Sequence, residues 1–342
     1  MINLMNDYNV IAHNKILKDL QKYQTELHVG YGMDDVCVEA KELIKKELNN
    51  YDVDIHFLVG GTITNKIALN HILKPYEAII AADSAHIYVH ETGAIESNGH
   101  KIITVKNVDG KVTVDAIHKV MKSHTDCHMV KPKVVYISNS TEYGTIYTKS
   151  ELFDLSNYCK HHGLYLYLDG ARLGTALTSK FNDLTLSEIC KFVDIFYIGG
   201  TKNGLMFGEA LVVKNENLKE NFRYTIKQNG GMLSKGFLLG IQFKSLFTDG
   251  LFYEIARNQN ELATYLDNGL NKLYIRHSMK TITNQIFITL DKEVVNKIKN
   301  HILFEVWEDL RDEQVIRFVT HLSLTKEDID KALNIIKESL DE

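Results

Sequence analysis

Short apolar runs alternate with segments of helical periodicity through the middle of the chain. The apolar runs, which we expect to be β-strands, read IHFLVG, AIIAAD, KIITV, KVVYISN, LYLYLD, FVDIFYIG and EALVV. Helical periodicity between them predicts helices at residues 62–73, 114–123 and 149–162. Short strands separated by helices are typical of a mainly parallel sheet that helices cover on both faces. The pattern therefore predicts an α/β fold of three layers.

The two ends of the chain are patterned differently from the middle. Further helices are predicted at residues 12–24, 36–49, 215–228, 234–247 and 251–275. Beyond them, short strands and helices alternate again, which indicates a second, smaller domain. We expect an N-terminal arm with helices (1–50) that packs on the small domain or a partner subunit, a large domain (51–250) and a small C-terminal α+β domain (251–342).

Composition excludes several classes of protein. The 342 residues are 44% hydrophobic, and the formal net charge is −5 with the basic residues scattered, so no surface for nucleic acid is indicated. The four cysteines (Cys37, Cys127, Cys159 and Cys190) are far apart and are typical of free thiols in a reducing compartment. No secretory leader is visible, and no apolar run approaches the ~20 residues of a membrane span. We therefore expect a cytoplasmic protein without a membrane segment.

Two strand ends carry the residues with the clearest chemical meaning. LYLYLD ends in Asp169, three residues before Arg172, and FVDIFYIG leads into the glycine-flanked Lys202. A buried carboxylate needs a partner, and a lysine amine in an apolar site has a lowered pKa and becomes a nucleophile. Both suit pyridoxal phosphate (PLP), which needs a lysine for a Schiff base and an acid at its ring nitrogen. The simpler alternatives are a helix N-cap with a surface arginine, and a lysine in a surface turn.

The segment GGTITN (60–65) lies between a predicted strand and a predicted helix. Free N–H groups and the dipole at a helix start favour a bound anion, and glycine lets a phosphate approach closely. The alternative is a plain turn in which Thr62 is the N-cap. The GK[ST] ending of a Walker loop is missing.

A histidine pair follows the strand AIIAAD. The first interpretation is a zinc site, because the two histidines are four residues apart, but His86, His90 and Glu91 read HxxxHE, which differs from the HExxH of helical zinc sites. The second interpretation is polar packing at a strand end. The third, which we favour for His86, is an imidazole stacked on a cofactor ring.

Arg317 lies inside a predicted strand of the small domain, in VIRFVTHLS. An arginine in such a strand needs a counter-anion, and its planar fork matches a carboxylate with two hydrogen bonds. The partner is either a substrate carboxylate or Glu305, and the sequence does not decide between them.

GGTITN, AHIYVHETGA, LDGARL, TKNG and IRFVTH, in this order, resemble the motifs of the threonine aldolase and β-eliminating lyase family. Its members are PLP enzymes of fold type I, the fold of aspartate aminotransferase, and the resemblance spans nearly the whole chain. It implies the three-layer PLP-transferase fold. It also implies roles for individual residues: Gly61 and Thr62 at the cofactor phosphate, His86 on the pyridine ring, Asp169 at the ring nitrogen, Arg172 near the phosphate or substrate carboxylate, Lys202 as the Schiff-base lysine, and Arg317 at the substrate carboxylate.

Three segments depart from the family pattern. The N-terminal Ser-Asp-Thr of threonine aldolases reads Asn6–Tyr8 here, which leaves Asp7 as a candidate substrate-binding residue. The histidine that faces the substrate β-hydroxyl in the family aligns with Glu142. The lysine segment reads TKNG in place of SKGLG. The groups that handle the hydroxyl are therefore altered, whereas the implied fold and cofactor are unaffected.

The resemblance implies an activity and an assembly. The activity is cleavage of a threonine-like β-hydroxy-α-amino acid to glycine and an aldehyde, with either His86 or Glu142 as the base. The assembly is a homodimer or homotetramer, in which Tyr31 and Gly32 reach a neighbour's site. The alternatives are β-elimination or amino transfer with the same cofactor, a PLP-binding protein without activity, and a metal-dependent enzyme using His86, His90 and Glu91.

Overall fold

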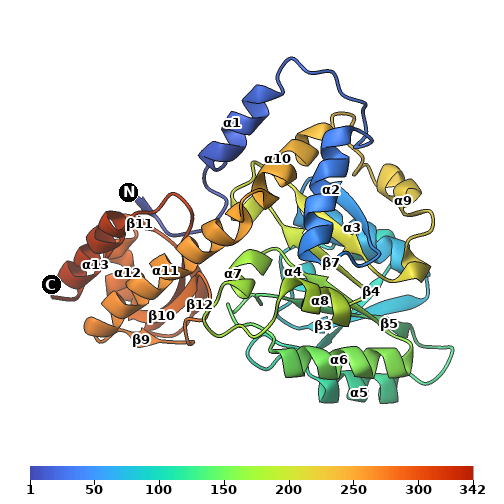
Figure 1. The fold of residues 1–342 in the computed structure, drawn as a ribbon. Helices are drawn as coiled ribbons and strands as arrows, with labels where there is room; N and C mark the ends of the chain where they lie inside the picture. The colour runs from blue at the N-terminus through green and yellow to red at the C-terminus, as the bar shows by residue number, and fades with distance from the viewer. Residues whose placement is uncertain (342) are drawn as a thin grey trace.

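A seven-stranded sheet forms the middle layer of the computed structural model, which describes residues 1–341 (Figure 1). The strand order is β2-β8-β7-β6-β5-β3-β4. The strands are β2 (Asp54–Leu58), β3 (Glu77–Ala82), β4 (Lys101–Val105), β5 (Lys131–Ser138), β6 (Tyr165–Asp169), β7 (Ile195–Gly199) and β8 (Glu209–Val213). Neighbouring strands are parallel except at β8, which is antiparallel to both β2 and β7. The expected mainly parallel sheet is confirmed.

Helices cover both faces of this sheet, as its apolar strands require. Figure 1 shows α5 (Val114–Ser123) and α6 (Lys149–His162) on one side and α2 (Asp35–Glu47) and α10 (Phe237–Phe247) on the other. The remaining helices of this part are α3 (Gly61–Ile72), α4 (His86–Val89), α7 (Leu173–Leu177), α8 (Leu186–Phe192) and α9 (Phe222–Gln228). The local sequence determines where several of these helices begin and end. Thr148 and Glu151 form a capping box at the start of α6, for example, and Gly163 ends it with a φ of 64°.

The C-terminal part folds around a second hydrophobic cluster and a four-stranded sheet in the order β12-β13-β10-β9. These antiparallel strands are β9 (Arg276–His277), β10 (Gln285–Asp291), β12 (Glu305–Asp309) and β13 (Glu313–Val319). The helices are α11 (Leu251–Lys272), α12 (Lys292–Ile298) and α13 (Lys326–Asp341). Long helix α11 supplies residues to both hydrophobic clusters and so joins the two parts.

The N-terminal segment contacts both parts of the molecule. Its first strand, β1 (Ile2–Asn3), pairs with β11 (Ile302–Leu303) beside the small sheet. Helix α1 (Asn14–Lys22) and helix α2 then pack against α10. The division of the chain at residues 50 and 250 stays a prediction.

One predicted helix is broken in the structure. The segment 215–228 forms a 3₁₀ turn (Glu216–Leu218) and then α9, because Asn221 adopts a left-handed conformation with a φ of 59° between them. All four cysteines are free thiols. Among residues 1–341, no helix is long and apolar enough to cross a membrane, and no group of three or more His, Cys, Asp or Glu side chains is arranged to hold a metal ion.

Candidate active site

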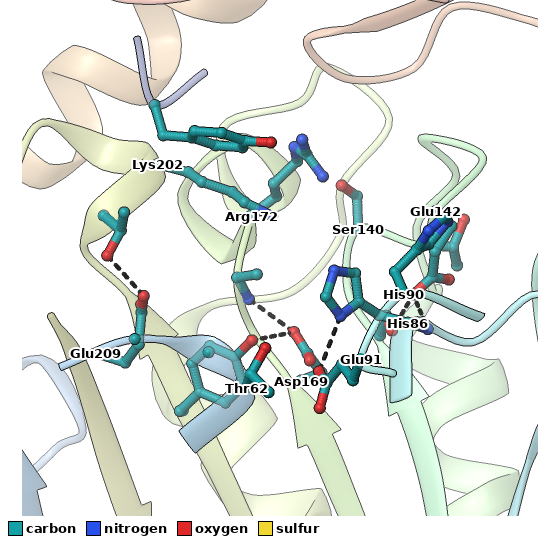
Figure 2. Close-up of a pocket in the computed structure, with 18 of the residues that line it drawn as sticks. Thr62, His86, His90, Glu91, Ser140, Glu142, Asp169, Arg172, Lys202 and Glu209 are labelled. Carbon is teal, nitrogen blue, oxygen red and sulfur yellow. Dashed lines mark hydrogen bonds and ion pairs between the residues drawn. The ribbon is translucent and has the colours of Figure 1, made fainter. Parts of the chain in front are cut away.

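The carboxyl ends of the parallel strands and the edge of the small sheet surround a cleft of about 440 Å³ (Figure 2). Parallel strands place their loops at one edge of the sheet, which is where ligands bind in such folds. The sequence-predicted residues that line the cleft are Gly61, Thr62, His86, Glu142, Asp169, Arg172, Lys202 and Arg317. Asp7 contacts Arg172 at the wall of the cleft.

Asp169, at the end of β6, is held by four hydrogen bonds. Its Oδ2 accepts from the Tyr136 hydroxyl at 2.5 Å and from Asn65 Nδ2 at 3.1 Å. Its Oδ1 accepts from the Tyr197 hydroxyl at 2.5 Å and from the Ala171 N–H at 3.0 Å. Burial, and then the Asp169 carboxylate, raise the pKa of both tyrosines well above its usual value, so both hydroxyls stay protonated and donate. The carboxylate is therefore fixed in position and faces the cleft.

Lys202 lies in a 3₁₀ turn (Thr201–Asn203) directly after β7. Burial, and then the Arg172 guanidinium, lower the pKa of its amine, which favours the nucleophilic free base. The turn is tightly packed from behind. A Cβ at Gly200 would come within 2.6 Å of the Gly208 carbonyl oxygen, so glycine is required there. The interpretation of Lys202 as a surface turn residue does not fit this setting.

A buried carboxylate from β8 braces the lysine turn. Glu209 accepts hydrogen bonds from the Gly200 N–H at 2.9 Å and from Thr201 Oγ1 at 2.8 Å. Thr201 Oγ1 in turn accepts from the Gly208 N–H at 3.0 Å. Burial raises the pKa of Glu209 to about 7. Glu209 was not among the residues predicted from the sequence.

The start of α3 presents backbone N–H groups to the cleft. Gly60 is the N-cap, in place of Thr62, and no side chain caps the helix there. The N–H groups of a first helical turn have no intrahelical acceptor, so an anion can bind them. A Cβ at Gly61 would lie 3.1 Å from the Tyr197 hydroxyl, whereas Gly60 faces open space. This corner of the cleft suits a phosphate.

The two candidate bases, His86 and Glu142, lie side by side. His86 Nδ1 is 2.8 Å from Glu91 Oε1, which also accepts from Asn65 Nδ2 at 2.8 Å. This contact turns the other ring nitrogen, Nε2, toward the cleft (Figure 2). Glu142 accepts from the His86 N–H at 3.0 Å and from Ser138 Oγ at 2.9 Å, and burial raises its pKa.

Arg172 and Asp7 form a buried ion pair. The guanidinium Nε and Nη2 lie 2.7 Å and 3.0 Å from the two carboxylate oxygens of Asp7, and Asn284 Nδ2 donates a third bond at 3.0 Å. Burial alone would raise the pKa of Asp7, but Arg172 and Lys202 hold it below its usual value. Two of the donors that sequence analysis assigned to a phosphate or substrate carboxylate are thus taken by Asp7.

Arg317 lines the cleft and also pairs with Glu305, its cross-strand neighbour. Its Nη1 donates to Gln285 Oε1 at 3.1 Å, and its guanidinium carbon lies 5.0 Å from the centroid of the Trp307 ring. The buried Nε has no hydrogen-bond partner within residues 1–341. The structure therefore shows the Glu305 alternative, and binding of a substrate carboxylate by Arg317 stays a prediction.

Tyr31 lies outside this cleft. It is 47% exposed, with its carbonyl oxygen 3.2 Å from Arg223 Nη2 and its ring 4.8 Å from Lys227 Nζ. The contribution of Tyr31 to a neighbouring subunit's site stays a prediction.

Several residues that contact the predicted site residues, or line the cleft beside them, were not predicted from the sequence. These are Asn65, Tyr136, Tyr197, Glu209, Tyr8 and Trp307, all of which line the cleft or contact the residues that do. One signal was available. Glu209 opens the otherwise apolar run EALVV, where a charged residue requires a specific partner.

These features fit PLP. A fixed carboxylate suits the pyridine nitrogen, and a lysine with a lowered amine pKa suits the Schiff base. The uncapped start of α3 suits the phosphate, and the oriented imidazole of His86 suits the face of the ring. All four lie around one cleft.

Comparison with known proteins identifies relatives over most of the chain. A family model described as β-eliminating lyase matches residues 16–293. The chain is 33% identical over 276 residues to the low specificity L-threonine aldolase of Pseudomonas sp. (strain NCIMB 10558), a match that covers 79% of each chain. It is 25% identical over 304 residues to the low specificity L-threonine aldolase of Escherichia coli O157:H7, which covers 87% of each.

Solved structures of similar fold include a threonine aldolase. The threonine aldolase of Leishmania major is 44% identical and superposes with a TM-score of 0.97 over 99% of each chain. An aspartate aminotransferase of Thermus thermophilus, at 13% identity and a TM-score of 0.72 over 99% of this chain and 91% of its own, has the same fold. The chain therefore belongs to the threonine aldolase and β-eliminating lyase family of PLP-dependent enzymes.

Proposed function

We propose that this enzyme cleaves the Cα–Cβ bond of a threonine-like β-hydroxy-α-amino acid and releases glycine and an aldehyde. The observation that carries the proposal is the convergence of Lys202, Asp169 and His86 on one cleft. Relatives named as threonine aldolases support the choice of substrate.

Lys202 and Asp169 hold the cofactor in this proposal. Bound PLP supplies an electron sink for the pair that the breaking Cα–Cβ bond leaves behind. Lys202 would hold the cofactor through its amine, whose lowered pKa favours the free base that such a bond requires. Asp169, whose carboxylate Tyr136 and Tyr197 fix in place, would hold the ring nitrogen and favour its protonated form.

Arg317 binds the substrate carboxylate. Arg317 lines the cleft, and its Nη1 and Nη2 each keep one hydrogen beyond those given to Gln285 and Glu305. The Nε and Nη2 of Arg172, in contrast, already donate to Asp7. A bidentate arginine orients a carboxylate as well as attracting it. The orientation selects which bond at Cα breaks.

His86 takes the proton from the β-hydroxyl group. Glu91 holds its Nδ1, which leaves Nε2 free to accept that proton as the carbonyl group of the aldehyde forms. The proton then returns to Cα to complete glycine. Glu142 anchors the backbone N–H of His86, and it is the alternative base.

Product analysis tests the proposal. Purified protein with added PLP is incubated with L-threonine and with L-allo-threonine, and glycine and acetaldehyde are measured. Both products are expected from at least one isomer. Lys202→Ala should abolish turnover and the adduct trapped by borohydride, and activity retained in this variant would contradict the assignment. His86→Asn and Glu142→Gln in the same assay distinguish the two bases.

A second activity is favoured by the family match itself, which is to β-eliminating lyases. Elimination yields ammonia and a keto acid, whereas aldol cleavage yields glycine. Ammonia without glycine from a β-hydroxy amino acid would replace the proposed reaction by elimination.

The assembly and compartment are also proposals. We infer a homodimer or homotetramer in the cytoplasm, supported by the half-exposed Tyr31 and by four free thiols. Light scattering on the purified protein measures the mass, and a monomer would contradict the shared site.

A further inference from the structure

Glu209 stands between the two segments that hold the cofactor. It opens β8, and in the sheet register it lies opposite Leu58 of β2 and Gly199 of β7. Strand β2 runs into the start of α3, which suits the phosphate, and β7 runs into the Lys202 turn. Because β8 is antiparallel to both, its first residue meets the carboxyl ends of both neighbours.

The carboxyl group is enclosed and lines the cleft. Glu209 is 4% exposed, and Figure 2 shows its side chain on the same side of the cleft as Lys202. It accepts the Gly200 N–H and the Thr201 hydroxyl, and Thr201 Oγ1 itself accepts the Gly208 N–H. The Thr201 hydroxyl proton is therefore directed at Glu209 and is unavailable to a phosphate.

The charges around Glu209 come from three elements. Lys202 of the turn is the cation, Asp169 of β6 is a second carboxylate, and the neutral phenols of Tyr167 and Tyr197 lie on β6 and β7. The register partners on β2 and β7 are uncharged. Burial is the main reason that the pKa of Glu209 lies at about 7, so its charge changes near neutral pH.

A bound phosphate adds negative charge at this end of the cleft, about −1.5 to −2 at neutral pH. Two anions in an enclosed space repel strongly, because the effective dielectric constant there is low. A shared proton relieves such a pair. Glu209 is nearer in the sheet to the phosphate segment than Asp169 is, because β8 pairs with β2, whereas β6 lies two strands farther away.

We propose that Glu209 takes up a proton from solvent when the cofactor phosphate binds, so that the affinity for PLP falls as the pH rises. The carboxylate gains this proton to become a neutral acid, and no other bond changes. The inference does not depend on which substrate bond the enzyme breaks.

Cofactor binding as a function of pH tests the inference. Holoenzyme and its Glu209→Gln variant are equilibrated with free PLP between about pH 6 and about pH 9, and bound PLP is read from its visible absorbance. The dissociation constant of the wild type, divided by that of Glu209→Gln, should rise about tenfold for each pH unit above about pH 7. Glu209 raises the pKa of Lys202, so the titration of the lysine differs between the two proteins and cancels only when PLP and pyridoxal are compared on one protein.

Glu77→Gln is the matched control. Glu77 is a buried carboxyl that accepts the Lys74 N–H at 3.0 Å and does not line the cleft, so the same ratio should stay constant with pH. A constant ratio for Glu209→Gln would mean that Glu209 only braces the lysine turn, and would overturn the inference.

A second measurement uses only the wild-type protein, so it tests the inference even if Glu209→Gln fails to fold. Wild-type affinities for PLP and for pyridoxal, which lacks the phosphate, are compared across the same pH range. The preference for PLP should fall with rising pH, although ionisation of the phosphate alone acts in the opposite direction. A preference that is constant or rises with pH overturns the inference without any substitution.

Discussion

Glu305 forms an ion pair with the guanidinium of Arg317, which we expect to bind the substrate carboxylate. It faces Arg317 across β12 and β13, in a pair that is open to the cleft on one side. A substrate carboxylate must therefore displace or share this partner. A partly exposed ion pair contributes about 1 kcal/mol, so Glu305→Gln should lower KM for L-threonine roughly fivefold, with little change in kcat. Steady-state kinetics on the purified variant measures both.

Arg317→Lys is the companion variant, because lysine keeps the charge but loses the planar fork. It should raise KM. If Glu305→Gln also raises KM, Glu305 orients the arginine and does not compete with the substrate.

Single residues were predictable where the neighbouring sequence was unusual. Asp169 and Lys202 stand at the ends of apolar strands, so the cost of burying their charges pointed to a function. The Arg172–Asp7 pair was not predictable, because 165 positions separate its members and no local pattern links them. Tyr136 was missed since a tyrosine in a buried strand reads as core packing.

At the scale of helices and strands, the stability of the fold depends on close contact between helices. On α10, a Cβ at Gly240 would come within 2.5 Å of Cys37 Sγ on α2 and within 2.9 Å of the Cys37 backbone. Overpacking of this kind costs about 1–3 kcal/mol, so Gly240→Ala should lower the free energy of unfolding by that amount. Urea unfolding monitored by circular dichroism measures the change.

Ser245→Ala is the control on the same helix. The buried hydroxyl of Ser245 interacts with the Asp19 carboxylate, whose pKa it helps to lower, so its loss should lower the free energy of unfolding by only about 1 kcal/mol. Equal stability of Gly240→Ala and the wild type would show that α2 can move away from α10.

Most elements could be predicted because their periodicity is strong. Helices at 114–123 and 149–162 match α5 and α6 at both ends, since Thr113 and Thr148 cap them. The apolar pattern of EALVV does not reveal the direction of β8, but its connection to β7 does. No helix was predicted between these strands, and residues 200–208 are shorter than the dozen or more residues that a parallel crossover needs, which indicates the antiparallel direction that the structure shows.

At the scale of the whole molecule, the cleft belongs to segments far apart in the chain. The N-terminal arm adds β1 beside the small sheet and then brings Asp7 to Arg172 of the large sheet. Long helix α11 contributes to both hydrophobic clusters. Sequence patterns predicted the two sheets, but how they face each other depends on long-range contacts such as these, which no local pattern encodes.

Buried His56 links the stability of the whole fold to pH. Its ring stacks on Phe222 with centroids 4.9 Å apart, and burial lowers its pKa to about 3. The unfolded chain binds a proton at this residue below about pH 6.5, whereas the folded chain does not. Stability is therefore present above that pH and is lost as the pH falls, by about 1.4 kcal/mol for each unit.

The variant His56→Phe keeps the stacked ring and removes the titration. Its free energy of unfolding, measured with urea from about pH 7 to about pH 5, should exceed that of the wild type by a margin that grows by about 2 kcal/mol over this range. Exposed His161 is the control, and His161→Gln should follow the wild type at every pH. Parallel pH curves for His56→Phe and the wild type would show that His56 can take up a proton without unfolding, because water reaches the ring.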